Sequence, residues 1–364
     1  MQDHERTAWV DIAKGVSIIL VVGMYAAYNT GEHTGQVGFL HYVIGFATPF
    51  RMPEFFLISG LLLSRVIDRA WLRYADRRVV HYLYFYALWA FIIIALKVGV
   101  YGASPAAMSR AIALALVEPY GVLWFIYLLA LFGAIAKLCR QFRVPHWLVL
   151  SAAAFLQMAV VSSSSYVIQQ FAAYFVFYYV GYAFAPFVFR LAGWAQANRR
   201  PAAIGLAAWA LANGLLVYSP GFEVLPTHTE MGYAALPPLH LALAIAGALA
   251  ICVFAALVCQ SRAVEWLRWL GEHSLVVYVA FTIPMSLFRG LAMWSGLIMQ
   301  TGPLSAAVLV VSIATPVALF WTVNQLGVGL FLFERPGWAR IAGDRIRAIS
   351  ELPGAGRARH KCVP

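Results

Sequence analysis

The sequence has few charged residues. Only 11% of its 364 residues are Asp, Glu, Lys or Arg, whereas 62% are hydrophobic. A soluble globular domain carries roughly 25% charged residues. The shortage of charge therefore excludes an ordinary soluble domain and indicates a protein that crosses a membrane several times.

Cysteine is scarce as well, and polar linkers are absent. The four cysteines are scattered and none has a metal-type spacing, so we expect neither a disulfide framework nor a metal site. With no linker, we expect a single transmembrane domain over residues 1–335 and a basic cytoplasmic tail over 336–364. The first apolar run has no small-residue cleavage site, which predicts a retained span and not a signal peptide.

The long apolar runs predict an all-α, polytopic membrane protein with about ten transmembrane helices. A helix needs about 20 mostly apolar residues to cross the hydrocarbon core. The short apolar segment 103–118 is bounded by prolines, and we expect it to lie along the surface or to re-enter. The ten candidate spans lie near residues 11–28, 38–64, 79–100, 122–138, 146–161, 168–189, 202–219, 238–259, 274–294 and 304–333.

Basic residues fall on alternate connections between these spans. The connection 65–78 holds five arginines, whereas 29–37, 162–167 and 220–237 hold neither Lys nor Arg. Most of the 26 Lys and Arg residues follow this alternation. The positive-inside rule then predicts that both termini are cytoplasmic. The net charge of +11 reports this topology, with attraction to anionic membrane lipids as a by-product, and the basic residues are too dispersed for nucleic-acid binding.

The second span contains charges that do not belong in lipid. Arg51 and Glu54 flank Pro53 in the stretch FATPFRMPEFFLISG. An intramembrane ionisable side chain usually faces a protein interior or a watery cavity. Arg51 needs an anion, which could be Glu54, Asp11 or a ligand. Two hypotheses stay open here: an Arg51–Glu54 ion pair that fixes packing, or a site for an anionic ligand at a broken helix.

Four stretches in order resemble the acyltransferase 3 family of bacterial integral-membrane acyltransferases. VDIAKGVSIILVVGMY matches the family's first helix, and PFRMPEFFLISGLLL matches its MP-x-FF-x-x-SG stretch. VLWFIYLLALF matches its LWFL segment, and LGEHSLVVYVAF matches its LG-x-x-S-x-x-x-Y segment. The order and spacing agree over residues 7–335.

The resemblance implies a fold, a reaction and a set of site residues. Family members move acyl groups from acyl-CoA onto glycans, so it implies a multi-pass protein of the bacterial inner membrane. The implied co-substrate is acetyl-CoA or a related acyl-CoA, with no bound cofactor, and the acceptor is a sugar hydroxyl of an envelope polysaccharide or oligosaccharide. Ser59-Gly60 would allow close helix approach within the substrate cavity. The expected substrate-binding residues are Asp11, Lys14, Glu54, Ser59, Trp124 and Tyr278.

The sequence departs from the family at two positions in the first span. The family's arginine, ten residues and histidine correspond here to Lys14 and Tyr25. Lysine keeps the charge but lacks the bidentate fork of arginine. The resemblance implies that the histidine is the catalytic base, and a phenol, with a pKa near 10, is a poor base at neutral pH.

A nearby histidine could replace the missing base. Tyr25 and His41 both fall about one turn below the predicted outer surface, on helices joined by a short connection. Imidazole is the side chain best suited to proton transfer near neutral pH. We therefore predict a catalytic group of Tyr25, His41 and Arg51, with an interfacial histidine of no chemical role as the alternative. His33, His228 and His240 are outer-side candidates with weaker positional support.

The favoured function is thus a membrane-bound O-acyltransferase. A catalytically impaired pseudo-acyltransferase that lost its base at Tyr25 is one alternative. A glycan or lipid transporter is another, because broken helices around buried charge also mark transport sites. The arginines of 65–78 are topological signals that could also meet the phosphates of CoA.

Overall fold

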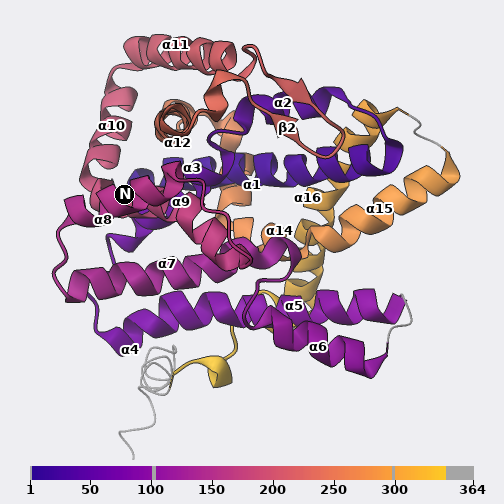
Figure 1. Ribbon diagram of the computed structural model, residues 1–364. Coiled ribbons are helices and arrows are strands. Elements are labelled where there is room, and N and C mark those ends of the chain that lie inside the picture. The colour runs from indigo at the N-terminus through magenta and orange to yellow at the C-terminus, as the bar shows by residue number, and fades with distance from the viewer. Residues whose placement is uncertain (1, 101–103, 297–299, 342–364) are drawn as a thin grey trace, which may run out of the picture. The chain divides into compact units, whose positions relative to one another are not determined.

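The computed structural model describes residues 2–100, 104–296 and 300–341, and its regular structure is nearly all helical (Figure 1). Within those residues the only sheet is a two-stranded antiparallel hairpin of β1 (Glu223–Val224) and β2 (Thr229–Glu230). The all-α prediction is confirmed. Contacts divide the chain into two compact units, Met1–Ser64 with Phe142–Trp321 and Arg65–Gln141 with Thr322–Pro364. The predicted basic tail lies outside the described residues from position 342 onward.

The first unit is built around α1 (Gln2–Thr34), which packs against α3, α12 and α13. Its other helices are α2 (Phe39–Ala47), α3 (Arg51–Leu63), α8 (His146–Met158), α9 (Tyr166–Ala183), α10 (Ala185–Ala197), α11 (Arg199–Val217), α12 (Pro237–Val258), α13 (Glu265–Glu272), α14 (Ser274–Ala280), α15 (Thr282–Ser295) and most of α16 (Thr301–Leu326).

Helices α3 and α9 are in backbone contact. A Cβ atom placed on Gly60 would overlap the carbonyl oxygen of Tyr178, and one placed on Gly181 would overlap that of Leu57. The absence of a side chain at both positions is therefore what permits the approach. The close helix approach predicted at Ser59-Gly60 is confirmed.

The expected span 38–64 is broken. Helix α2 ends at Ala47, a turn follows, and α3 begins at Arg51. Pro53 lies in the first turn of α3, where a backbone N–H has no helical partner, so it does not disrupt the helix. The carbonyl of Phe46 at the break accepts a hydrogen bond from Asn213 Nδ2 at 2.9 Å. Irregular backbone at membrane depth is thus satisfied by a neighbouring helix.

Two further expected spans are bent. Helices α9 and α10 meet at 71°, and α14 and α15 meet at 54°. The span predicted to reach 333 ends at Leu326, because Gly327 adopts a left-handed conformation with φ of +66°.

The number of spans differs from the prediction. Within the described residues, six helices are long and apolar enough to cross a membrane, or eight if each bent pair is one span. Helix α8 has 13 residues and is roughly 20 Å long, which is short of the roughly 30 Å hydrocarbon core. The count of about ten is not confirmed.

The second unit contains α5 (His81–Val100), α6 (Pro105–Ala115) and α7 (Trp124–Gln141), the last preceded by the 3-10 turn η2 (Gly121–Leu123). Helix α5 is entered through α4 (Trp71–Tyr74) and a π-helical turn, η1 (Ala75–Val80). Helix α6 is capped by the Ser104 side chain and packs on α5, with Ala115 as its one buried residue among those described. The last part of the chain, with η5 (Leu330–Leu332) and η6 (Gly337–Ala339), also contacts α5.

Candidate functional site

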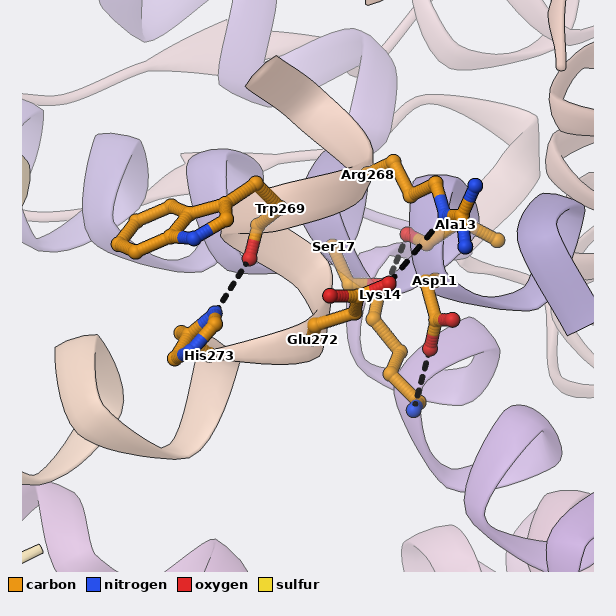
Figure 2. Close-up of polar contacts among 8 residues, drawn as sticks. All are labelled: Asp11, Ala13, Lys14, Ser17, Arg268, Trp269, Glu272 and His273. Atoms are coloured by element: carbon orange, nitrogen blue, oxygen red, sulfur yellow. Dashed lines mark hydrogen bonds and ion pairs between the residues drawn. The ribbon is translucent and has the colours of Figure 1, made fainter. Parts of the chain in front are cut away.

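Close packing of α1 against α13 sets the geometry at the start of α1 (Figure 2). A Cβ atom on Gly15 would overlap the carbonyl oxygen of Leu267, and one on Gly271 would overlap that of Asp11. Gly271 belongs to the LGEHS stretch. The late motif is therefore held directly against the first motif.

Lys14 and Asp11 form an ion pair one helical turn apart. Lys14 Nζ lies 3.0 Å from Asp11 Oδ1, and the two side chains are 22% and 16% exposed. Figure 2 shows this pair beside the segment that carries Glu272 and His273. Glu272 is instead paired with Arg268 at 3.2 Å. Two predicted substrate-binding residues thus lie together, with the charge of Lys14 balanced on its own helix.

His273 is fixed by its own segment (Figure 2). Its Nδ1 lies 2.9 Å from the Trp269 carbonyl oxygen, and its ring stacks on the Trp269 indole with 4.2 Å between centroids. A carbonyl oxygen only accepts, so Nδ1 donates. His273 is the residue at the junction between α13 and α14.

Arg51 and Glu54 do not pair. The hydroxyl of Ser17 on α1 donates to Glu54 Oε2, and Arg51 Nη1 donates to Thr48 Oγ1 at 3.1 Å. Among the described residues no ion pair joins Arg51 to any carboxylate. The Arg51–Glu54 ion pair that the sequence suggested is therefore absent among the described residues.

Both groups keep a buried polar atom without a partner. Arg51 Nε and Glu54 Oε1 are shielded from solvent and have no hydrogen-bond partner within the described chain. Glu54 is fully buried between α1 and α12, where the Cys252 thiol also interacts with it. Native proteins leave few such atoms unsatisfied, and each calls for an explanation. A ligand bound at the start of α3 would explain why Arg51 Nε has no hydrogen-bond partner.

Two tyrosines of α9 lie near the predicted catalytic positions Arg51 and Tyr25. Tyr174 interacts electrostatically with Arg51, and Tyr166 interacts with both Tyr174 and Tyr25. The ring of Tyr25 also lies 5.4 Å from that of Phe281. The proximity of Tyr166 and Tyr174 to two predicted catalytic positions favours a role in lining a substrate groove.

The side chain of His41 is held by backbone groups. It is fully buried, its Nδ1 accepts from the Gly38 backbone N–H at 3.2 Å, and its Nε2 lies 3.1 Å from the carbonyl oxygen of Pro226. The aromatic ring beside it is that of Tyr28, at 5.8 Å. Both ring nitrogens are engaged with backbone, so neither is available to an acceptor hydroxyl. The geometry gives His41 a structural role: it connects α2 to the turn between β1 and β2.

The remaining predicted site residues are mostly buried. Ser59 Oγ donates to the Phe55 carbonyl at 2.9 Å, so its hydroxyl is tied to its own helix. Tyr278 is 2% exposed and packs near Phe281. Trp124 is buried at the start of α7, in the second unit. Among the described side chains no group of three His, Cys, Asp or Glu could hold a metal ion.

The second unit has a pocket of about 180 Å³ lined by arginines. Its lining comes from the 65–78 connection and consists of Val66, Arg69, Arg73, Tyr74, Arg77 and Arg78. The two acidic residues of this connection are engaged by arginines that do not line the pocket. Asp68 pairs with Arg140 at 3.0 Å, and buried Asp76 pairs with Arg335 at 2.6 Å. Each of these two carboxylates is thus paired with an arginine outside the pocket lining.

Lys137 is a residue whose role the sequence did not reveal. It is 8% exposed, and its Nζ donates to the carbonyl oxygens of Ile67 and Arg69 at 2.5 and 2.9 Å. The ammonium also lies over the rings of Trp71 and Tyr74. Its position inside the apolar run LFGAIAKLC was the available signal. Lys137 fixes the backbone that carries the arginines of the pocket.

The comparisons with known proteins identify the family of the chain. Neither the curated proteins nor the solved structures contain a match to the chain. A family model described as an acyltransferase domain matches residues 7–323, which is most of the chain and includes all four motifs. The chain belongs to the acyltransferase 3 family.

Proposed function

We propose that this membrane acyltransferase moves an acetyl or similar acyl group from acyl-CoA to a sugar hydroxyl of a cell-envelope polysaccharide or oligosaccharide. Acyl-CoA is the co-substrate, and no bound cofactor takes part. The protein would lie in the bacterial inner membrane with ten spans and both termini cytoplasmic.

The arginine-lined pocket is the observation that carries the donor assignment. CoA bears phosphates, and guanidinium groups bind phosphate through paired, charge-assisted hydrogen bonds. The side chain of Arg69 has no partner within the described chain, and Lys137 holds its backbone in place. The basic connection 65–78 would face the cytoplasm under the positive-inside rule, which is where acyl-CoA is found.

Ten spans are compatible with the helices described. The six long helices and two bent pairs supply eight. The broken pair α2–α3 and the short helix α8 would supply the other two, with α3 packed against α9 and α12 and α8 packed against α9. Broken spans of this kind are tolerated where protein or a cavity covers the irregular backbone.

We propose that the transfer site lies at the start of α3. Arg51 would bind an oxygen of the acyl group or acceptor through its unpartnered Nε. Preorganised donors of this type stabilise the charge that develops on oxygen during acyl transfer. The aromatic rings of Tyr25, Tyr166 and Tyr174 would line the acceptor side.

A non-catalytic acyltransferase is the second candidate, and two observations favour it. Tyr25 stands where the family's base is expected, and both nitrogens of His41 are engaged. Such a protein would bind acyl-CoA without transferring the acyl group.

The two candidates are separated by supplying purified protein in detergent with labelled acetyl-CoA, with and without glycan. We expect acyl release and transfer in the parent. The Arg73→Gln/Arg77→Gln variant should raise the KM for acetyl-CoA by roughly tenfold or more, because each charged hydrogen bond contributes about 1.5–3 kcal/mol.

The Arg200→Gln variant is the control, because it removes a charge from an exposed position of the first unit. Acetyl-CoA binding without release or transfer would establish the non-catalytic candidate. An unchanged KM in the double variant would contradict the donor assignment.

A further inference from the structure

Two polar side chains meet inside the apolar helices of the first unit. Gln157 near the end of α8 and His240 near the start of α12 share a hydrogen bond of 3.0 Å between Gln157 Nε2 and His240 Nδ1. Gln157 is only 9% exposed, and His240 is partly buried. Polar side chains within membrane helices are costly to bury and usually serve a function.

The pair has unused hydrogen-bonding capacity. Gln157 Oε1 is buried and has no partner in the described chain, and no hydrogen bond involves His240 Nε2. If the amide donates to the ring, Gln157 Oε1 remains an acceptor and His240 Nε2–H a donor. If the ring donates to a flipped amide, the amide remains a donor and Nε2 an acceptor. Either assignment leaves one donor and one acceptor.

One donor beside one acceptor complements a hydroxyl group, which both donates and accepts. A charged ligand would need a counter-charge here, and neither α8 nor α12 contains Asp, Glu, Lys or Arg. A neutral alcohol therefore fits the pair better than a phosphate or carboxylate.

The position of the pair fits an acceptor that arrives from outside. Gln157 precedes the connection 159–165, and His240 follows the connection 218–236, and neither connection contains Lys or Arg. Connections of this composition lie on the non-cytoplasmic side of a membrane. The arginine-lined pocket is formed by the basic connection 65–78, which the same rule assigns to the cytoplasmic side.

We propose that Gln157 and His240 form a binding subsite for a hydroxyl group of the sugar acceptor. Only the identification of the ligand as the sugar acceptor rests on the proposed function. The recognition of a neutral hydroxyl follows from the pair itself. An ordered water would satisfy the same groups and is the competing occupant.

Binding is measured apart from catalysis, by saturation-transfer NMR with methyl hexosides and their singly deoxygenated analogues. The parent should give saturation transfer, and one deoxy analogue should bind at least about tenfold more weakly, because it leaves buried polar groups unpaired. The Gln157→Met and His240→Gln variants should lose that discrimination. The Arg200→Gln variant, at an exposed position of the first unit, should retain it.

The outcomes separate the subsite from the acyltransferase proposal. Hexoside binding that is lost in both variants supports the subsite even if acetyl-CoA is never turned over. Discrimination that persists in folded Gln157→Met and His240→Gln proteins overturns it, as does a parent that binds no methyl hexoside. If Gln157→Met fails to fold, the milder Gln157→Asn variant, which retracts the amide by one carbon, must weaken the discrimination or the subsite is rejected.

Discussion

Ser17 on α1 donates a hydrogen bond to Glu54 on α3, and both side chains are fully buried. This contact joins the first two family motifs through their polar side chains. It also explains why Glu54 does not pair with Arg51, although the two lie three residues apart on one helix.

Removing the hydroxyl of Ser17 should destabilise the protein. Ser17→Ala leaves the buried Glu54 carboxyl without a partner, at an expected cost of about 1–3 kcal/mol. The double variant Ser17→Ala/Glu54→Leu should be less destabilised than Ser17→Ala, because it removes both partners together. Thermal unfolding in detergent measures both, with exposed Ser109→Ala as the control. A double variant that melts below Ser17→Ala would argue against the hydrogen bond.

Arg51→Lys should lose activity while the protein still folds. Lysine keeps the positive charge but not the planar guanidinium that places Nε at the site. We expect a fall in kcat of about 10²-fold, the size typical of losing one donor to a developing oxyanion. Turnover of labelled acetyl-CoA and accumulation in the membrane are the two measurements. Full activity, or failure to fold, would remove the ligand-binding role.

His41→Ala should lower stability more than rate. Both ring nitrogens contact backbone groups, so the substitution loosens the hairpin from α2 and removes no base. We expect a lower melting temperature and a change in kcat well under the 10²–10⁴-fold typical of a lost general base. A folded His41→Ala protein that loses that factor would restore the substitute-base hypothesis.

Tyr25→His should raise the rate of acyl transfer. The substitution places an imidazole where the family resemblance expects the base, next to the tyrosines that lead to Arg51. Tyr25→Phe is the matched control, because it removes the hydroxyl and adds no base. Equal rates for the histidine and phenylalanine variants would show that position 25 has no proton-transfer role.

A methyl group at Gly60 should be poorly tolerated. Gly60→Ala places its Cβ into the Tyr178 carbonyl, and overpacking of this kind costs about 1–3 kcal/mol. Gly205→Ala on α11 is the control: nothing lies within 4 Å of its Cβ, and alanine is the better helix former. Thermal unfolding should separate the two, and equal melting temperatures would contradict the contact.

Both termini are predicted to be cytoplasmic. Reporter fusions after Gln36 and Thr227 should score periplasmic, and fusions within 65–78 should score cytoplasmic, because only the last connection is basic. A cytoplasmic signal after Thr227 would rule out the ten-span arrangement.

The sequence was informative where one pattern determines one outcome. Apolar runs indicated helices, and Ser59-Gly60 indicated close packing, because only a residue without Cβ allows backbones to touch. The sequence was misleading where two side chains could bind the same carboxyl group. Arg51 and Glu54 have the spacing of an ion pair, but Ser17, 37 residues earlier, holds the carboxylate.

Long-range contacts explain the other differences. His41 was matched with Tyr25 by depth in the membrane, yet its Nε2 partner is the Pro226 carbonyl, 185 residues away. Lys137 resembled a topological signal, but it binds two carbonyl oxygens about 70 residues earlier. Neither contact leaves a local pattern in the sequence.

The paired glycines also limit how the first unit can move. Helices α3 and α9 touch through Gly60 and Gly181, and α1 and α13 through Gly15 and Gly271, so neither pair can slide without a backbone clash. Each pair should therefore move as one rigid body during a catalytic cycle. We therefore expect access for substrates to come from rotation about the helix breaks, which lie at the turn before Arg51, at Phe184 and at Phe281. A crosslink between α3 and α9, or between α1 and α13, should leave turnover intact. A crosslink that fixes the angle at one of the helix breaks should stop turnover.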